Sequence, residues 1–276
     1  MRSKSACACC ERRRSSISSS RDATMTQRRT LDLITYAPAL VGKDGRTVDV
    51  IHGMETSLPD LRLEWRLSDS GRPIPLPQRD AWLVESIEDG EFPIVCNGDV
   101  NYPVTVDGRE RSGLFSPGGQ PLFEVHAKMP LGEAVIAAAA AVLEAVAEGA
   151  RAFWGSATPY AAKVDIAYQT APTLQGPPSP RRGLPALKLP PHIRSPEIPY
   201  YLGWMNYWSA AAAQAIGFPD PARDADLLSR ARRTASGGWV VQLTDAPLDL
   251  DNPAHLDALK RAYERFPQVG GRVTPD

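Results

Sequence analysis

The chain has 276 residues, and 43% of them are hydrophobic, which is enough apolar surface for a globular core. The formal net charge is −1 overall, but residues 31–276 hold 23 Lys/Arg against 30 Asp/Glu and therefore carry about −7. A body of that charge repels phosphates, so we expect no nucleic-acid binding. No stretch approaches about 18 consecutive strongly apolar residues, so we expect no membrane span either.

Residues 1–24 differ from the rest of the chain. They contain Cys7, Cys9 and Cys10 together with a Ser/Arg run, and they show no apolar periodicity. We expect this leader to be disordered and to lie upstream of a true start at Met25. Two alternatives stay open, namely an organelle transit peptide and a soft-metal site in the Cys-x-Cys-Cys motif.

Residues 25–276 are expected to form a single α+β domain. Cys96 is their only cysteine, so no disulfide can form within them, and a reducing cytoplasm is the expected location. Strand and helix patterns interleave irregularly, which favours a mixed or antiparallel sheet with helices packed on it. In the first half, apolar spacing and turn residues predict a strand at 31–36, a helix at 48–58, a strand at 61–67, a helix at 79–89, a hairpin of 92–96 and 102–106, and a strand at 122–127.

A long central helix is predicted over 131–153. Val135, Val142, Val146 and Phe153 recur at multiples of three and four residues, with alanines filling the same stripe, which is typical of a close-packing face. A shorter helix is expected to follow from an N-cap at Thr158 into the 160s.

The segment 172–199 contains nine prolines, which exclude a regular helix or a central strand. We expect an irregular strap over the domain surface, or a linker. A third alternative is recognition of Arg181 and Arg182 by a partner groove that binds polyproline-type chain.

Five aromatic residues then follow within nine positions: Tyr200, Tyr201, Trp204, Tyr207 and Trp208. Tyr201, Trp204 and Trp208 would share one face of a helix that continues to Ile216 and ends at Gly217. Each ring removes roughly 150–250 Å² from water when it is covered, so the group can anchor a core or a partner. We take the five as candidate partner-binding residues, with the core as the alternative.

The C-terminal part predicts a strand at 239–244 and a helix with Asn252 as N-cap and Pro253 at its first position. Leu256, Leu259, Tyr263 and Phe266 would form the apolar face of that helix.

No motif identifies a reaction. His52, His126, His192 and His255 lack metal-ligand spacing, and the paired glycines do not form a phosphate-binding pattern, so no metal or cofactor is expected. Cys96, Asp99 and His126 are the least weak catalytic candidates, because they could assemble a cysteine nucleophile and its base.

Three stretches carry a family resemblance: Leu31–Pro38, Pro199–Trp208, and Gly238–Thr244 leading into Asp251–His255. They resemble a family of uncharacterised bacterial proteins that begin near Met25. The last stretch is also similar to the closing segment of immunity proteins from bacterial toxin systems. Neither resemblance supplies catalytic residues.

These observations favour a non-enzymatic cytoplasmic binding protein, such as an immunity protein that neutralises a toxin by direct binding. The acidic body suits a basic protein partner, since opposite charge speeds encounter. The alternatives are an enzyme with a dispersed active site and a structural protein that acts through its proline-rich segment.

Overall fold

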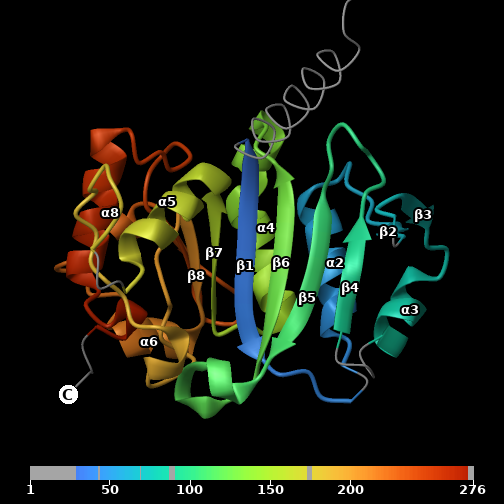
Figure 1. The fold of residues 1–276 in the computed structure, drawn as a ribbon, viewed down its shortest axis with the longest axis horizontal. Coiled ribbons are helices and arrows are strands. Elements are labelled where there is room, and N and C mark those ends of the chain that lie inside the picture. The colour runs from blue at the N-terminus through green and yellow to red at the C-terminus, as the bar shows by residue number, and fades with distance from the viewer. Residues whose placement is uncertain (1–28, 43, 69, 87–90, 173–175, 273–276) are drawn as a thin grey trace, which may run out of the picture.

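The computed structural model describes residues 29–272 except positions 43, 69, 87–90 and 173–175, so the expected leader and start site lie outside the described residues. Its centre is a ten-stranded antiparallel sheet of order β3-β2-β4-β5-β6-β1-β7-β8-β10-β9 (Figure 1). The predicted α+β class is confirmed. The strands are β1 (Thr30–Pro38), β2 (Trp65–Leu67), β3 (Pro73–Pro75), β4 (Glu91–Cys96), β5 (Thr105–Arg111), β6 (Leu122–Pro130), β7 (Trp154–Pro159), β8 (Met205–Trp208), β9 (Ala231–Arg233) and β10 (Trp239–Gln242).

The helices cover the two faces of the sheet unequally. Two helices, α2 and α4, lie behind the sheet in Figure 1, whereas α5, α6 and α8 lie in front of its left half, and no helix stands in front of β4, β5 and β6. None of the described helices has the length and hydrophobicity needed to cross a bilayer. Their bounds are α2 (Arg46–Ser57), α3 (Arg79–Ser86), α4 (Glu133–Ala150), α5 (Tyr160–Thr170), α6 (Ala210–Ile216), α7 (Ala225–Leu228) and α8 (Pro253–Arg265).

The predicted long helix is present as α4, and its small residues let α2 approach closely. A Cβ on Gly53 of α2 would lie 3.0 Å from the Cβ of Ala145, and one on Gly149 would lie 2.8 Å from the backbone N of Val50. Phe153 falls outside the helix, contrary to the prediction. The chain leaves the helix at Arg151, whose φ of 54° is left-handed, and enters β7 at Trp154.

The helix predicted over the aromatic segment is wrong. Residues 205–208 form β8, and α6 begins only after Ser209, whose Oγ accepts a hydrogen bond from the Ala212 N–H at 3.1 Å. All four residues of β8 are buried because helices cover both faces of the sheet there. A strand buried on both faces shows no alternation in its sequence, so periodicity could not identify it.

The period-two pattern at 61–67 yields a strand only at 65–67. Leu61 and Leu63 are nevertheless buried, and the Leu63 N–H donates to Glu55 Oε1 at 2.8 Å. The predicted hairpin is present as β4 and β5, and the final helix has the expected cap, because Asn252 Oδ1 accepts from the Ala254 N–H at 3.0 Å.

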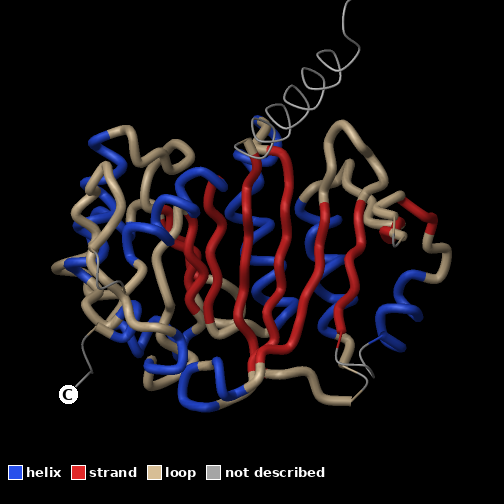
Figure 2. Tube along the Cα trace, viewed as in Figure 1, coloured by secondary structure: helices blue, strands red, loops and turns tan. Residues whose placement is uncertain are grey.

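The described part of the proline-rich segment, 176–199, follows the surface of α5 and the C-terminal region, largely as loop (Figure 2). Leu184, Leu187 and Ile193 are buried in the core, and the Leu187 N–H donates to the Thr170 carbonyl at 2.9 Å. Arg182 forms ion pairs with Asp165 and Asp251 at 2.9 and 2.6 Å. These contacts favour a strap over a free linker.

We expect Gly149→Ala to destabilise the fold by about 1–3 kcal/mol, because the added methyl overlaps the α2 backbone. This sign is informative, since Gly→Ala inside an unobstructed helix stabilises by up to about 1 kcal/mol. Urea denaturation measures the change. Ala137→Ser, on the exposed side of α4, is the control and should stay within about 0.5 kcal/mol. A Gly149→Ala variant that is more stable than the parent would contradict the close helix contact.

Candidate functional site

The uncovered half of the sheet carries a band of charged side chains on β5 and β6. Lys128 lies opposite Asp32 in the β1–β6 register, and Asp32 accepts from Lys163 of α5 at 2.9 Å, so this row faces the α5 side of the sheet. The residues between, such as Val106 and Val125, are buried on the opposite side. We call this band the open face; its residues are Thr105, Asp107, Arg109, Arg111, Glu124, His126 and Lys128.

Glu124 is the centre of the open face and is fully buried. Its Oε1 lies 2.6 Å from Arg111 Nη2, and its Oε2 accepts from Arg109 Nε at 3.1 Å and lies 3.5 Å from His126 Nε2. The Arg111 contact is an ion pair without aligned hydrogen-bond geometry, so Oε1 keeps unsatisfied acceptor capacity. Burial alone would raise the pKa of Glu124, but His126, Arg111 and Arg109 together lower it below its ordinary value.

Arg109 is held in place yet remains accessible. Its side chain is 68% exposed, and its Nε donates to Oε2 of the buried Glu124 at 3.1 Å. On the next pair of the ladder, Asp107 lies opposite His126, and burial raises the pKa of Asp107 despite the nearby positive charges. A solvated face is ordinary for an antiparallel sheet, but a fully buried carboxylate that contacts the exposed Arg109 and the partly buried Arg111 is not.

The structure does not bring the three catalytic candidates together. Cys96 is buried at the end of β4, and β5 separates it from His126 on β6. Asp99 lies in the β4–β5 loop, where its Oδ1 accepts from the N–H groups of Asn101 and Tyr102 at 2.8 and 3.2 Å. Within the described ranges, no group of three or more His, Cys, Asp or Glu side chains could hold a metal ion.

The five aromatic candidates lie in and against the core. Tyr200, Trp204, Tyr207 and Trp208 are buried, and Tyr201 is partly buried. The Trp204 indole donates to the Thr244 carbonyl at 2.9 Å, and Trp208 meets the rings of Phe218 and Phe266 edge-on. The buried rings are unavailable to a partner in this conformation, because neighbouring strands and helices already cover them. Their burial therefore favours the core alternative over an exposed anchor for a partner.

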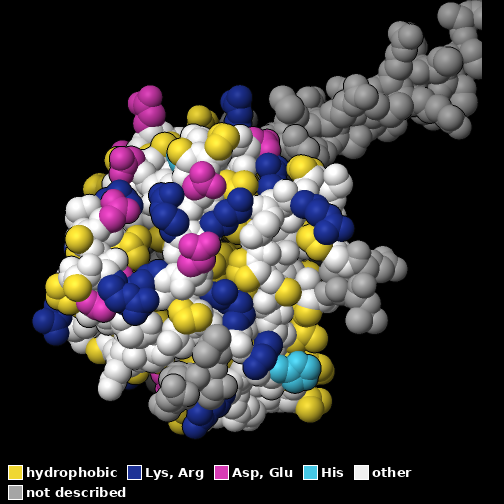
Figure 3. Space-filling model, turned by 90° about the vertical axis from the view of Figure 1, so that its left-hand side faces the viewer, with side chains coloured by type: hydrophobic (Ala, Val, Ile, Leu, Met, Phe, Trp, Pro, Cys, Tyr) yellow, Lys and Arg dark blue, Asp and Glu magenta, His cyan; other side chains and the backbone are white. Residues whose placement is uncertain are grey.

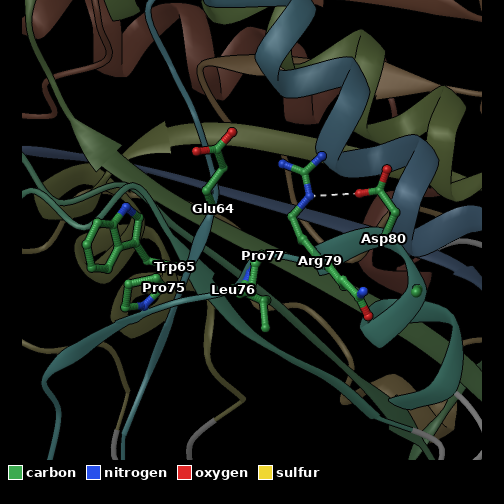
Figure 4. Close-up of a pocket in the computed structure, with 9 residues that line it drawn as sticks. Glu64, Trp65, Pro75, Leu76, Pro77, Arg79 and Asp80 are labelled. Atoms are coloured by element: carbon green, nitrogen blue, oxygen red, sulfur yellow. Dashed lines mark hydrogen bonds and ion pairs between the residues drawn. The ribbon is translucent and has the colours of Figure 1, made fainter.

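A second feature lies at the β2–β3 edge of the sheet. It is a cavity of about 620 Å³ between these strands and the start of α3, and sequence reasoning missed it because its walls come from separate elements. In Figure 4, Trp65 and Pro75 lie together on one side, Arg79 and Asp80 lie on the other, and Glu64 lies between them. The open face and this cavity are both candidate binding surfaces.

The chain belongs to the family described as Domain of unknown function (DUF5953). The family model matches residues 42–274, which confirms the resemblance to an uncharacterised family. The fold is also similar to a solved structure entitled "Pseudomonas aeruginosa T6SS protein PA0821", with a TM-score of 0.50 and 14% identity over 86% of this chain and 72% of that one. The comparison with curated proteins gave no significant match.

We expect Trp204→Ala in this DUF5953 protein to cost about 3–5 kcal/mol of unfolding free energy, because it empties a buried ring site. Trp204→Phe keeps most of the packing and removes only the indole N–H, and the Thr244 carbonyl still accepts from Gln242 Nε2 at 2.7 Å, so its loss of stability should be smaller. Chemical denaturation of the two variants measures both values. A folded Trp204→Ala variant with unchanged stability would contradict the core role.

We expect Glu124→Gln to cost about 1–3 kcal/mol at pH 7, since Arg109 and Arg111 lose their charged partner. The folded-state pKa of Glu124 is lowered, so its stabilising contribution is complete above the unfolded carboxyl pKa of about 4.3 and is lost as the pH falls below it. Denaturation at pH 7 and at pH 3 should therefore show a gap between parent and variant that narrows in acid. A gap of equal size at both pH values would contradict this ion-pair account.

Proposed function

We propose that this DUF5953 protein is a non-enzymatic cytoplasmic binding protein, specifically an immunity protein that neutralises a toxin by direct contact. The open face carries the proposal, because it combines an uncovered half of the sheet with charged side chains already held in position. The structural neighbour is named as a T6SS protein, which is consistent with an immunity role. The negative charge of residues 31–276 fits a partner that is basic overall, whereas Arg109 on the open face would contact an acidic group of that partner.

A face is a better docking surface here than a sheet edge. β3 forms one edge, and Pro73 and Pro75 remove two of its three backbone donors. β9 forms the other edge, where Arg232 and Arg233 are exposed and Arg232 pairs with Glu144 of α4 at 2.5 Å. Prolines and charges on edge strands oppose pairing with another chain. Strand addition by a partner is thus disfavoured at both ends.

Arg109 is the residue on the open face best suited to hold a partner. Arginine is enriched among the residues that dominate binding energy at protein interfaces. A side chain that is already fixed loses less conformational entropy when it binds, and the contact between Arg109 Nε and Glu124 provides that fixation.

An enzyme using Cys96, Asp99 and His126 is less favoured, since these residues lie apart.

The test is co-expression with the protein encoded by the adjacent gene, followed by affinity purification and a growth assay. We expect a complex and protection from toxicity. Arg109→Ala should weaken binding by at least about 30-fold, which is a loss of about 2 kcal/mol, while the protein stays folded. Arg261→Ala is the matched control, because Arg261 is exposed on α8 away from the open face.

Two results would overturn the proposal. One is the absence of any complex or protection with neighbour-encoded proteins. The other is equal binding by the Arg109→Ala variant and the parent, because the open face would then lie outside the interface. Circular dichroism of each variant separates lost binding from lost folding.

A further inference from the structure

We propose that the cavity at the β2–β3 edge binds the guanidinium group of an arginine side chain on the partner protein. The cavity places an aromatic and apolar wall opposite carboxylates, and this combination recognises organic cations. The identity of the partner rests on the proposed function, but the chemistry of the cavity can be tested without it.

One wall of the cavity is a flat apolar surface made by Trp65 and Pro75, which pair across β2 and β3. Gly98 fixes the indole from another side: a Cβ there would lie 2.8 Å from three indole atoms, so only glycine permits this contact. Trp65 is consequently pre-ordered. A planar guanidinium can stack on such a ring, whereas a compact ammonium gains less from it.

The charged wall has more negative than positive groups. Glu55 and Asp80 both contact Arg79, at 2.6 and 2.8 Å, so the single arginine of this wall is already neutralised. Asp80 also meets His52 at 2.9 Å. Burial alone would raise the pKa of Asp80, but Arg79 and His52 lower it overall, so the carboxylate stays ionised at neutral pH.

Glu64 is the group that remains for a ligand. It is exposed, it lines the cavity, and its carboxylate makes no hydrogen bond or ion pair with the described residues. With Asp80 it gives the cavity lining two carboxylates against the single cation of Arg79, an excess of one negative charge. A cation entering between Trp65 and Glu64 would supply the missing counter-charge.

The cavity also adjoins the open face. Trp65 lies opposite Cys96, Cys96 opposite Thr105, and Thr105 opposite Lys128, so Trp65 belongs to the same row across the sheet. A partner lying on the open face could therefore reach the cavity with one arginine. The face formed by α8 and the strap instead carries charges of both signs. Figure 3 shows Lys and Arg side chains interspersed with Asp and Glu, and exposed Arg181, Arg261 and Asp257 belong to these elements.

The probe is N-acetyl-arginine amide, compared with N-acetyl-citrulline amide, which has a similar shape and no charge. Binding is followed by NMR through the indole N–H signals of the six tryptophans, with Trp65 assigned by its loss in Trp65→Phe. We expect the arginine amide to shift the Trp65 signal with a dissociation constant of ~1–10 mM, and the citrulline amide to bind at least about threefold more weakly. Glu64→Gln should remove that difference.

Glu85→Gln is the matched control, because Glu85 is an exposed acid on α3 that does not line the cavity, and it should leave arginine binding unchanged. Equal shifts with both amides, or undiminished arginine binding by Glu64→Gln, would overturn the cavity proposal. A lysine amide that binds more tightly than the arginine amide would also overturn it.

The same variants distinguish this proposal from the proposed function. If the arginine amide binds but no neighbour-encoded protein does, the immunity role fails and the cation site stands. If a partner protein binds equally well to Glu64→Gln and to the parent, the cavity does not hold the partner, whereas the immunity role stands.

Discussion

The close packing of α4 is the constraint on which the rest of the structure depends. Gly149 and Ala145 allow α2 to approach the backbone of α4, and both helices then cover one face of the sheet. Buried residues on β5 and β6, such as Val106 and Phe123, line that closed face. An antiparallel sheet can leave its other face in water without losing its core. Any binding surface on the sheet is thereby restricted to the opposite face or to an edge.

On that opposite face the covering layer ends part-way across the sheet. Tyr36 on β1 belongs to an aromatic cluster with Trp154 and Tyr200, and its partner in register on β6 is Glu124. Glu124 therefore lies at the boundary, buried beside the aromatic rings and paired with the exposed Arg109. The open face offers the exposed Arg109, and the edge cavity offers the Glu64 carboxylate. A partner that presents both signs of charge would bind in a single orientation.

Local signals predicted the elements whose sequences carry their own evidence. The alanine stripe of α4, the Asn252 cap of α8 and the turn between β4 and β5 each act through neighbouring residues, so they could be recognised without knowledge of the fold. The aromatic residues of 200–208 gave a wrong helix. Their spacing suits a helix, but β7 and β10 supply backbone partners on both sides and helices cover both faces, and this tertiary context overrides spacing.

The sequence by itself determined the α+β class, the long small-residue helix, the acidic character of the body and the membership of an uncharacterised family. Only the tertiary structure decided that the aromatic segment fills the core and that the catalytic candidates lie apart. It alone brought Glu64 and Trp65 together with Arg79 and Asp80 and placed Arg109 against the buried Glu124. The reason is physical: helix caps and apolar periods arise from contacts over a few residues, whereas strand order and the covering of each face depend on the whole chain.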